Sequence, residues 1–552
     1  MEEKIVLPPK YYHTNFEYLL TFVKEKYHHL LNTSEWSFLR KYYTLPEDAQ
    51  CLFIRFTNRK GLFFRSDNLK YEELQDIPSQ LKTLLKAGFL SKPDPLEHLH
   101  LTKDLLDVLT KAELLKFFSL NSMKSEKKEV IVSYLLAEFD YSELIKIINE
   151  ATEIVKMNFE MEVSFLRFLF FGNRAMDMTE FVLRDMGLVQ YYQQQEDDLV
   201  ARFETRKDAD DKWMVSDQFL IFDELSKSVE TQEVLEWYMT LFDTIKDLSP
   251  IAKPSFDKLA LRVARFFERA KQPGYAIEVY KTTPIAPARE RLTRCLAKLG
   301  NIEEAKTWCE LMIEQPQNND EQYFAEYFIG NLGTKKSKKQ TTTWLQNSKE
   351  IVISKIYKNQ VELGAIDYFF ENEFEAAFSE NYPWRSIFGL WLWDIIFDPT
   401  LVSFHHPFQR RPSDLYLPDF YEKRHEQVEA KLMEFSDSDE LLEYLWLNFT
   451  KHLDTANPFV VWLEEIWTLV RIIVIRIDLE SLRSIVRKMA ENLVENSRGF
   501  PDLLVWSESH YELVEIKGPN DNLSHQQLFW LRYFEEIGVK ASVLRVKYQK
   551  DE

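Results

Sequence analysis

The chain has 552 residues, a formal net charge of −20, 13 glycines and only three cysteines, Cys51, Cys295 and Cys309. This length exceeds what one hydrophobic core fills, and the scattered cysteines exclude a disulfide framework or a cysteine-rich zinc site. A Gly-rich phosphate loop, a secretory signal and an 18-residue apolar run are also missing, which argues against an NTPase, a dehydrogenase, a secreted protein and a membrane protein.

Residues 1–100 are predicted to form a winged-helix-like DNA-binding region. Apolar residues in Phe16–Val23 recur at helical spacing. Two β-rich runs flank Asn58–Gly61 and predict a hairpin between Cys51 and Arg65. Its basic residues indicate either a solvated tip or DNA backbone contacts, which need local positive charge despite the acidic total; they are Arg55, Arg59, Lys60 and Arg65.

Residues 101–150 are predicted to form a SAP-like module, a small DNA-binding unit of two helices. A capping box at Thr110 and Glu113 starts the second helix. The candidate DNA contacts are Lys124, Lys127 and Lys128. A plain helical hairpin is the alternative for this segment.

Residues 151–345 are predicted to be helical throughout. The stretch Arg289–Met312 indicates helix, turn at Gly300 and helix, in the style of a tetratricopeptide (TPR) hairpin. Such arrays usually serve as scaffolds. The basic run 335–339 marks a boundary near residue 345, and beyond it the helix Trp384–Phe397 is apolar nearly all round, so we expect it to be buried.

Near the C-terminus, residues 501–506 and 511–517 predict two paired strands, followed by a helix from about Ser524 to Glu536. Side chains two apart on a strand face the same side, so Glu515 and Lys517 should point together, with Asp502 alongside them. An isolated Asp…Glu-x-Lys pattern arises easily by chance, and on a surface hairpin it is usually a solvated pair. Here the strand is otherwise apolar, and a buried carboxylate needs a partner or a metal ion.

This pattern suits metal-dependent cleavage of phosphodiesters. Asp502 and Glu515 would hold one or two Mg²⁺ or Mn²⁺ ions, with the carbonyl of Ile516 completing the coordination. Lys517 would orient water or offset developing negative charge. Gln527 fits either of two roles, a capping box with Ser524 or alignment of substrate or water at the active site.

The run from Pro501-Asp502 through Glu515-Ile-Lys-Gly-Pro-Asn-Asp-Asn-Leu-Ser-His-Gln-Gln-Leu-Phe-Trp-Leu531 resembles the VRR-NUC domain of the PD-(D/E)xK superfamily. More narrowly it resembles the Fanconi-associated nuclease family, with a second match at 380–397. The resemblance implies a multi-domain, mainly α-helical chain that ends in an α/β nuclease domain over 346–552. It also implies Glu380 as a further metal ligand, while Asp394 is expected to be a buried structural group.

The implied activity is structure-specific endonuclease cleavage of DNA near 5′ flaps and branched junctions, with 5′–3′ exonuclease action, in interstrand crosslink repair. Longer relatives carry a ubiquitin-binding Cys/His finger, which is missing here, so a shorter, bacterial type is expected. The protein would act as a monomer or dimer on DNA, in the cytoplasm or nucleoid of a bacterium or the nucleus of a eukaryote. Some relatives hold the 5′ phosphate in a basic pocket; candidates here, unless they are ordinary exposed charges, are Lys253, Lys258, Arg262 and Arg265.

Two other functions are compatible with the sequence. One is a sequence-specific, restriction-type endonuclease on the same catalytic core, against which the multi-domain scaffold argues. The other is a DNA-binding adaptor with a dormant nuclease fold, against which the intact set of Asp502, Glu515 and Lys517 argues.

Overall fold

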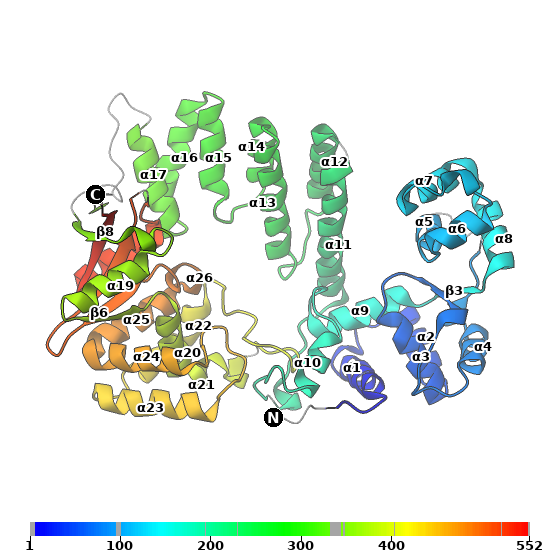
Figure 1. Cartoon of the computed structure of the whole chain (residues 1–552), viewed down its shortest axis with the longest axis horizontal. Coiled ribbons are helices and arrows are strands. Elements are labelled where there is room, and N and C mark those ends of the chain that lie inside the picture. Colours follow the sequence, from blue (N-terminus) through cyan, green and yellow to red (C-terminus); the bar gives the residue numbers. More distant parts are fainter. Residues whose placement is uncertain are drawn as a thin grey trace. The chain divides into compact units, whose positions relative to one another are not determined.

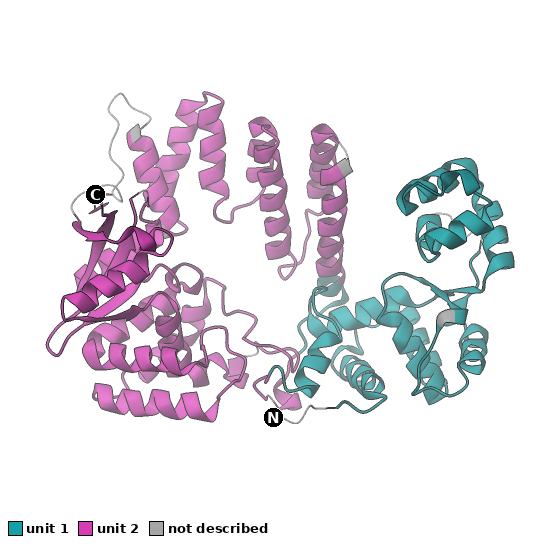
Figure 2. Ribbon diagram, in the orientation of Figure 1, with its two compact units in different colours: residues 1–189, 201–209 teal, residues 190–200, 210–552 magenta. Residues whose placement is uncertain are grey.

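The computed structural model describes residues 6–94, 101–193, 195–228, 230–331, 344–345, 348–401, 403–519 and 521–549. It divides into two compact units, residues 1–189 with 201–209 and residues 190–200 with 210–552 (Figure 2). Helices dominate both, as predicted (Figure 1). The predicted boundaries near 100, 150 and 345 stay predictions, and the basic run 335–339 lies outside the described residues.

Unit 1 contains short helices around a three-stranded sheet of order β1-β3-β2. Its elements are α1 (Tyr11–Tyr27), α2 (Thr33–Tyr42), α3 (Glu47–Thr57), β1 (Phe63–Arg65), η1 (Ser66–Asn68), α4 (Ile77–Ala87), β2 (Leu90–Ser91), α5 (Thr102–Asp107), α6 (Lys111–Phe117), η3 (Asn121–Met123), α7 (Lys128–Glu138), α8 (Tyr141–Ala151), β3 (Ile154–Met157), α9 (Glu160–Phe171) and α10 (Thr179–Asp185).

The hairpin predicted between Cys51 and Arg65 is wrong. The first β-rich run forms the end of helix α3, and β1 pairs in antiparallel fashion with β3, about 90 residues later in the chain. Cys51, Leu52, Phe53 and Ile54 are all fully buried. A helical segment with four consecutive buried residues shows no amphipathic period, so its sequence cannot be told from that of a buried strand.

The SAP-like segment folds as four short helices, α5 to α8, around one core. The capping box at Thr110 and Glu113 is present at the start of α6, as predicted. Leu105, Leu114 and Ile131 are buried in this core.

Unit 2 begins with a helical array, in which α13 to α17 pack successively against one another (Figure 1). Its elements are η4 (Glu196–Asp198), α11 (Arg206–Ser228, of which residues from 210 on belong to this unit), α12 (Thr231–Thr244), α13 (Lys253–Arg269), α14 (Pro273–Tyr280), α15 (Ala288–Lys298), α16 (Ile302–Glu314) and α17 (Asn319–Asn331). The helix–turn–helix predicted over 289–312 is confirmed as α15 and α16, with Gly300 in the left-handed conformation (φ +84°), while its TPR-like character stays a prediction.

The rest of unit 2 holds a five-stranded mixed sheet of order β4-β8-β7-β6-β5. Its elements are β4 (Lys349–Ile353), η5 (Lys355–Tyr357), α19 (Val361–Glu371), β5 (Glu375–Phe378), α20 (Tyr382–Trp391), α21 (Trp393–Ile396), η6 (Pro399–Leu401), α22 (Phe420–Leu432), α23 (Ser438–Lys451), α24 (Glu464–Arg476), α25 (Leu479–Glu491), α26 (Leu493–Asn496), β6 (Leu503–Trp506), β7 (Tyr511–Lys517), α27 (His525–Ile537) and β8 (Ala541–Tyr548).

The predicted C-terminal hairpin is confirmed as β6 and β7, paired in antiparallel register with Leu503 opposite Val514. Val514 and Ile516 pack with residues of α19 on one face of the sheet, while Val543 packs with Leu531 of α27. The apolar helix predicted over 384–397 is also confirmed, although it breaks at Leu392 into α20 and α21. In the described part of the chain, no helix has the length and apolarity needed to span a membrane.

Candidate active site

Asp502 and Glu515 meet at the end of the β6–β7 hairpin. Because Leu503 pairs with Val514, the register places Asp502 opposite Glu515 at the next position, where directly opposed side chains share a face. Asp502 Oδ2 accepts a 2.8 Å hydrogen bond from the Ile516 N–H. The two carboxylates are close enough for the charge of Asp502 to raise the pKa of Glu515. The predicted convergence of the two acids is therefore present.

Lys517 lies beside Glu515, as the alternation along the strand predicts. Its Nζ is 2.7 Å from Glu515 Oε1, and the side chains are 11% and 0% exposed. The contact is an ion pair without hydrogen-bond geometry: among the described residues, neither oxygen of Glu515 accepts a hydrogen bond. Glu515 is thus a fully buried carboxylate with a single cationic partner.

Burial raises the pKa of both acids. The pKa of Asp502 rises to about 6 through burial, partly offset by the Ile516 N–H and Lys517 and reinforced by the charges of Glu380 and Glu362. The pKa of Glu515 rises to about 8 through burial and the charge of Asp502, against the effect of Lys517. Buried, electron-rich oxygens that lack hydrogen-bond donors are suited to a divalent cation.

Glu380 reaches this cluster through the edge strand β5. Ser379 continues the pairing of β5 with β6, since its N–H donates to the Asp502 carbonyl at 2.8 Å and its Oγ donates to the Pro501 carbonyl at 3.1 Å. Glu380 therefore follows directly on the residue that is bonded to Asp502, and its charge acts on the Asp502 carboxylate.

Glu362 was not among the residues singled out from the sequence. It lies in the first turn of α19, and its charge also raises the pKa of Asp502. A Cβ added to Gly518, just after β7, would lie 3.7 Å from Val361, which places the start of α19 beside the end of β7. The two segments are more than 150 residues apart, so no local motif connects them.

The loop before Asp502 is tightly packed. Phe500 stacks on Trp530 of α27, with ring centroids 4.1 Å apart, and on Trp384 of α20 at 4.9 Å. Trp530 Nε1 donates to the Arg498 carbonyl at 3.1 Å. These aromatic contacts hold the Asp502 backbone in place from two helices.

The contacts made by the Gln527 and Asp394 side chains are with residues outside the Asp502–Glu515–Lys517 cluster. Gln527 Oε1 accepts from the Ser524 N–H at 2.8 Å, and Ser524 caps α27 in return, so the capping role is present. An active-site role for Gln527 stays a prediction. The expectation that Asp394 is buried is wrong, because its side chain is 62% exposed and contacts Tyr444 and Lys431 at the surface.

The side chains of Glu380, Asp502 and Glu515 do not form a complete metal-binding site in this conformation. As the side chains stand, no three acidic, histidine or cysteine groups of the described residues gather tightly enough to enclose an ion. The ligand set of Glu380, Asp502, Glu515 and the Ile516 carbonyl therefore stays a prediction, to which the position of Glu362 adds a candidate.

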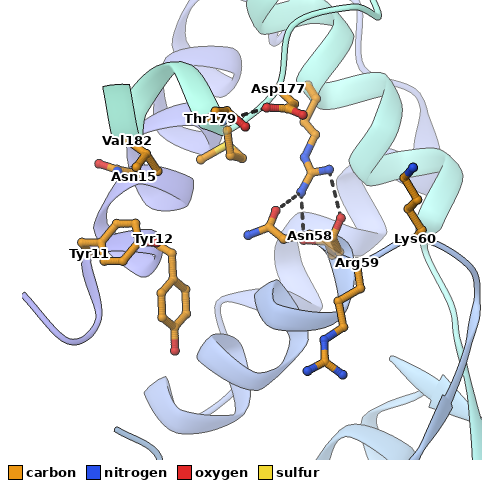
Figure 3. A pocket seen from close by; sticks show the side chains of 12 residues that line it. Tyr11, Tyr12, Asn15, Asn58, Arg59, Lys60, Asp177, Thr179 and Val182 are labelled. Atoms are coloured by element: carbon orange, nitrogen blue, oxygen red, sulfur yellow. Dashed lines mark hydrogen bonds between the residues drawn. The ribbon is translucent and has the colours of Figure 1, made fainter. Parts of the chain in front are cut away.

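The basic residues predicted to contact DNA in unit 1 differ in their surroundings. Arg55 pairs with Glu73 at 2.6 Å and lies over the Tyr12 ring, while Arg65 pairs with Asp67 and Glu113. Arg59 and Lys60 are exposed at the end of α3 and extend in different directions (Figure 3). Neither makes an ion pair with a described residue; both border a cavity of about 410 Å³.

The SAP-like lysines are also at the surface. Lys124 and Lys127 are exposed. Lys128 Nζ donates to the Asp107 carbonyl at 2.8 Å, which ties α7 to the end of α5. Their proposed contacts with DNA stay predictions.

In the helical array, α13 and α15 border a basic cavity of about 730 Å³. Three of the four residues predicted to bind phosphate line this cavity: Lys258, Arg262 and Arg265. The other basic residues of the lining are Arg269 and Arg291. Arg262 pairs with Asp223 at 2.6 Å and Arg291 with Glu268 at 2.8 Å.

Comparison with known proteins gives two domain matches. The model described as the FAN1 helix–turn–helix domain matches residues 10–91, and the VRR-NUC domain model matches residues 437–548. VRR-NUC nucleases are metal-dependent in general.

Similar proteins extend over the whole chain. The Fanconi-associated nuclease 1 homolog of Pseudomonas aeruginosa is 25% identical over 99% of this chain and 97% of its own length. The homolog of Arabidopsis thaliana is 27% identical over 99% of this chain and 68% of its own length. A crystal structure titled paFAN1 bound to 2-nucleotide 5′-flap DNA with a gap covers 99% of this chain and all of that chain, with a TM-score of 0.84 and 24% identity, and therefore has the same fold.

Proposed function

This chain belongs to the Fanconi-associated nuclease family, and on that premise we propose that it is a metal-dependent endonuclease that cuts DNA near 5′ flaps and branched junctions. The observation that carries the proposal is the burial of Asp502 and Glu515 on one face of the sheet with Lys517 as their neighbour. A protein that only bound DNA would gain nothing from two destabilised carboxylates.

Glu380, Asp502, Glu515 and the Ile516 carbonyl would hold Mg²⁺ or Mn²⁺, with Glu362 as a further ligand. The bound ion lowers the pKa of its water and stabilises charge on the phosphoryl and leaving oxygens. Lys517 would hold the attacking water in line and offset the charge that develops on the phosphate. The packed loop at Phe500 keeps the Asp502 backbone fixed while the DNA is cut.

The substrate class follows from the relatives. The solved structures are titled as complexes with 5′-flap DNA of one and two nucleotides. We therefore propose 5′-flap cleavage for this chain, with 5′–3′ exonuclease action and a role in interstrand crosslink repair, in whichever compartment holds the cell's DNA. We propose that it binds DNA as a monomer or dimer.

Three surfaces are proposed to hold the DNA backbone. In unit 1, Arg59 and Lys60 are better placed than Arg55 and Arg65, whose charges are already paired. The exposed lysines of the SAP-like module would add contacts, as would the basic cavity of the helical array, lined by Lys258, Arg265 and Arg269. Phosphate contacts of this kind set affinity and register rather than sequence preference.

The test is a cleavage assay on labelled flap, fork, nicked and blunt duplexes with Mn²⁺ or Mg²⁺. We expect cuts near the flap junction that disappear in Asp502→Ala. Asp394→Ala, an exposed aspartate on the neighbouring helix α21, is the matched control and should cut normally. Cutting of unbranched duplex at one fixed sequence would instead indicate a restriction-type enzyme, and tight binding without cutting would indicate an adaptor.

A further inference from the structure

Glu380 and the loop before Asp502 are joined by one side chain, that of Asn381. The N–H of Phe500 donates to Asn381 Oδ1 at 3.3 Å. The Asn381 Nδ2 donates to Glu380 Oε1 at 2.8 Å. Because a backbone N–H can only donate, the Phe500 contact requires the amide oxygen to face the loop, which leaves the NH₂ group for the carboxylate.

The backbone at Asn381 is strained. Its φ is +48° and its ψ −49°, and the Tyr382 N–H lies 2.5 Å from the Glu380 carbonyl across it. This is the classical γ-turn, which is rare because the central residue lies in a sparsely populated region. Asparagine tolerates positive φ better than other residues with a side chain, and strain of this kind persists only where surrounding contacts hold it.

The turn also connects two structural elements. On its N-terminal side, Ser379 is bonded to the backbone of Pro501 and Asp502. On its C-terminal side, the Asn381 carbonyl accepts from the Arg385 N–H at 2.9 Å, which starts helix α20. A change at Asn381 therefore acts on Glu380, Phe500 and the beginning of α20 together.

We propose that Asn381 is a positioning residue of the metal site: it sets the exposed Glu380 carboxylate against Asp502 by bonding both Glu380 and the loop that carries Asp502. This inference rests on the proposed function, because Glu380 and Asp502 are ligands only in that function. Contacts of this type orient ligands in metal sites, and their loss typically weakens metal binding about 10- to 100-fold.

The first test uses the metal-free protein. Asn381→Gly removes the amide and keeps the freedom to adopt positive φ, so the fold should be retained. We expect hydrogen exchange at the Phe500 amide to accelerate in this variant. Asn381→Asp keeps an acceptor for that amide, so its exchange should stay at the wild-type rate. Unchanged exchange in Asn381→Gly, or fast exchange in Asn381→Asp, would overturn the proposal.

The second test measures Mn²⁺ binding without DNA, from the electron paramagnetic resonance signal of free Mn²⁺. We expect Asn381→Gly to bind about tenfold more weakly. Glu373→Gly is the matched control, because Glu373 also has a positive φ (+64°) and is exposed but lies just after α19, and this variant should bind Mn²⁺ as the wild type does. Wild-type affinity in Asn381→Gly would overturn the positioning role.

Asp502→Ala separates the hypothesis of a metal site at Asp502 from the hypothesis that Asn381 positions Glu380 and the Phe500 loop. If Asp502→Ala binds Mn²⁺ as the wild type does, the proposed metal site fails. The exchange rate at Phe500 still decides in that case whether Asn381 holds the loop.

Discussion

Two pairs of opposite charges, each spaced two residues apart at the end of a strand, differ in what the fold does with them. In unit 1, Arg65 is the last residue of β1 and contacts both Asp67, at 2.5 Å, and Glu113. In unit 2, Glu515 and Lys517 end β7, and Glu515 is 0% exposed with Lys517 as its cation. The sequences of the two pairs look alike, but only the first has carboxylates that are fully bonded.

The pKa shifts of the two clusters have opposite signs. Hydrogen bonds from Arg65 lower the pKa of Asp67. Burial alone would raise the pKa of Glu113, but bonds from Thr110 and Arg65 lower it overall. Burial raises the pKa of Glu515 instead. A charge pair that stabilises the fold and a charge pair that is available for chemistry are therefore distinguished by hydrogen bonding and burial.

The largest expected effect is on cleavage. Glu515→Gln keeps the shape of the side chain but removes the charge, and we expect flap cleavage to fall to about one thousandth of the wild-type rate or below, because each 1.36 kcal/mol of lost transition-state stabilisation costs a factor of ten. Single-turnover rates with saturating Mn²⁺ measure it. Glu512→Gln, on the opposite face of the same strand, should cut normally. Equal losses of cleavage rate in Glu515→Gln and Glu512→Gln would contradict the assignment of the active site to the Glu515 face of β7.

Lys517 is the cation of the unsatisfied pair, and Lys517→Met should reduce the cleavage rate about a hundredfold. Substrate binding should change little, since one charge in a buried site adds little to backbone affinity. Lys547→Met is the control, because Lys547 also pairs with a glutamate, Glu350, but at a 62% exposed position on β8. A normal cleavage rate in Lys517→Met would show that the ion pair of Glu515 and Lys517 is purely structural, like the one at Arg65.

Stability should respond to pH in opposite directions at the two clusters. In the folded protein the pKa of Glu515 is about 8, whereas its ordinary value is 4.5. Because the folded state holds the proton more tightly than the unfolded state, the contribution of Glu515 to stability is fully present below pH 4.5. This contribution is lost as the pH rises through 8. Glu515→Gln cannot ionise and should be more stable than the wild type at pH 8.5, by on the order of 2–4 kcal/mol. Urea unfolding with a chelator, from pH 5 to 8.5, measures the difference.

At the Arg65 cluster the sign is reversed. Because the pKa values of Asp67 and Glu113 are lowered, their contribution is present above their ordinary pKa values and is lost as pH falls. Arg65→Gln should therefore destabilise the protein at neutral pH, by about 1–2 kcal/mol, and progressively less toward pH 3. The same pH trend in both variants would contradict the comparison.

The β6–β7 hairpin could be predicted because its information is local. Alternation along β7, the turn at 507–510 and the capping box at Ser524 each depend on neighbours in sequence. The hairpin predicted around Asn58 failed for the opposite reason, since β1 finds its partner β3 far along the chain. Glu362 was missed for the same reason: nothing within its own helix indicates that α19 begins beside β7.

Burial was the other quantity that the sequence could not supply. Asp394 lies in a run of buried aromatic and aliphatic residues, yet its side chain projects to the surface. Glu515 lies in a similar apolar run and is completely enclosed. The pattern of apolar residues located both elements, but the burial of Asp394 and of Glu515 depended on which neighbours packed against each side chain.

The smallest expected effect concerns DNA binding in unit 1, where Arg59 and Arg65 form a matched pair of arginines six residues apart. Arg65 is neutralised by Asp67 and Glu113, whereas Arg59 is exposed and has no ion pair with any described residue. Arg59→Ala should weaken flap binding a few-fold and lower the slope of log affinity against log salt concentration by about one, while Arg65→Ala should alter affinity less than about twofold. Fluorescence anisotropy from 50 to 200 mM salt measures both. If Arg65→Ala lowered the affinity for DNA more than Arg59→Ala did, Arg65 would have to leave Asp67 and Glu113 when DNA binds. A fully bonded charge pair could then no longer be taken as a purely structural one.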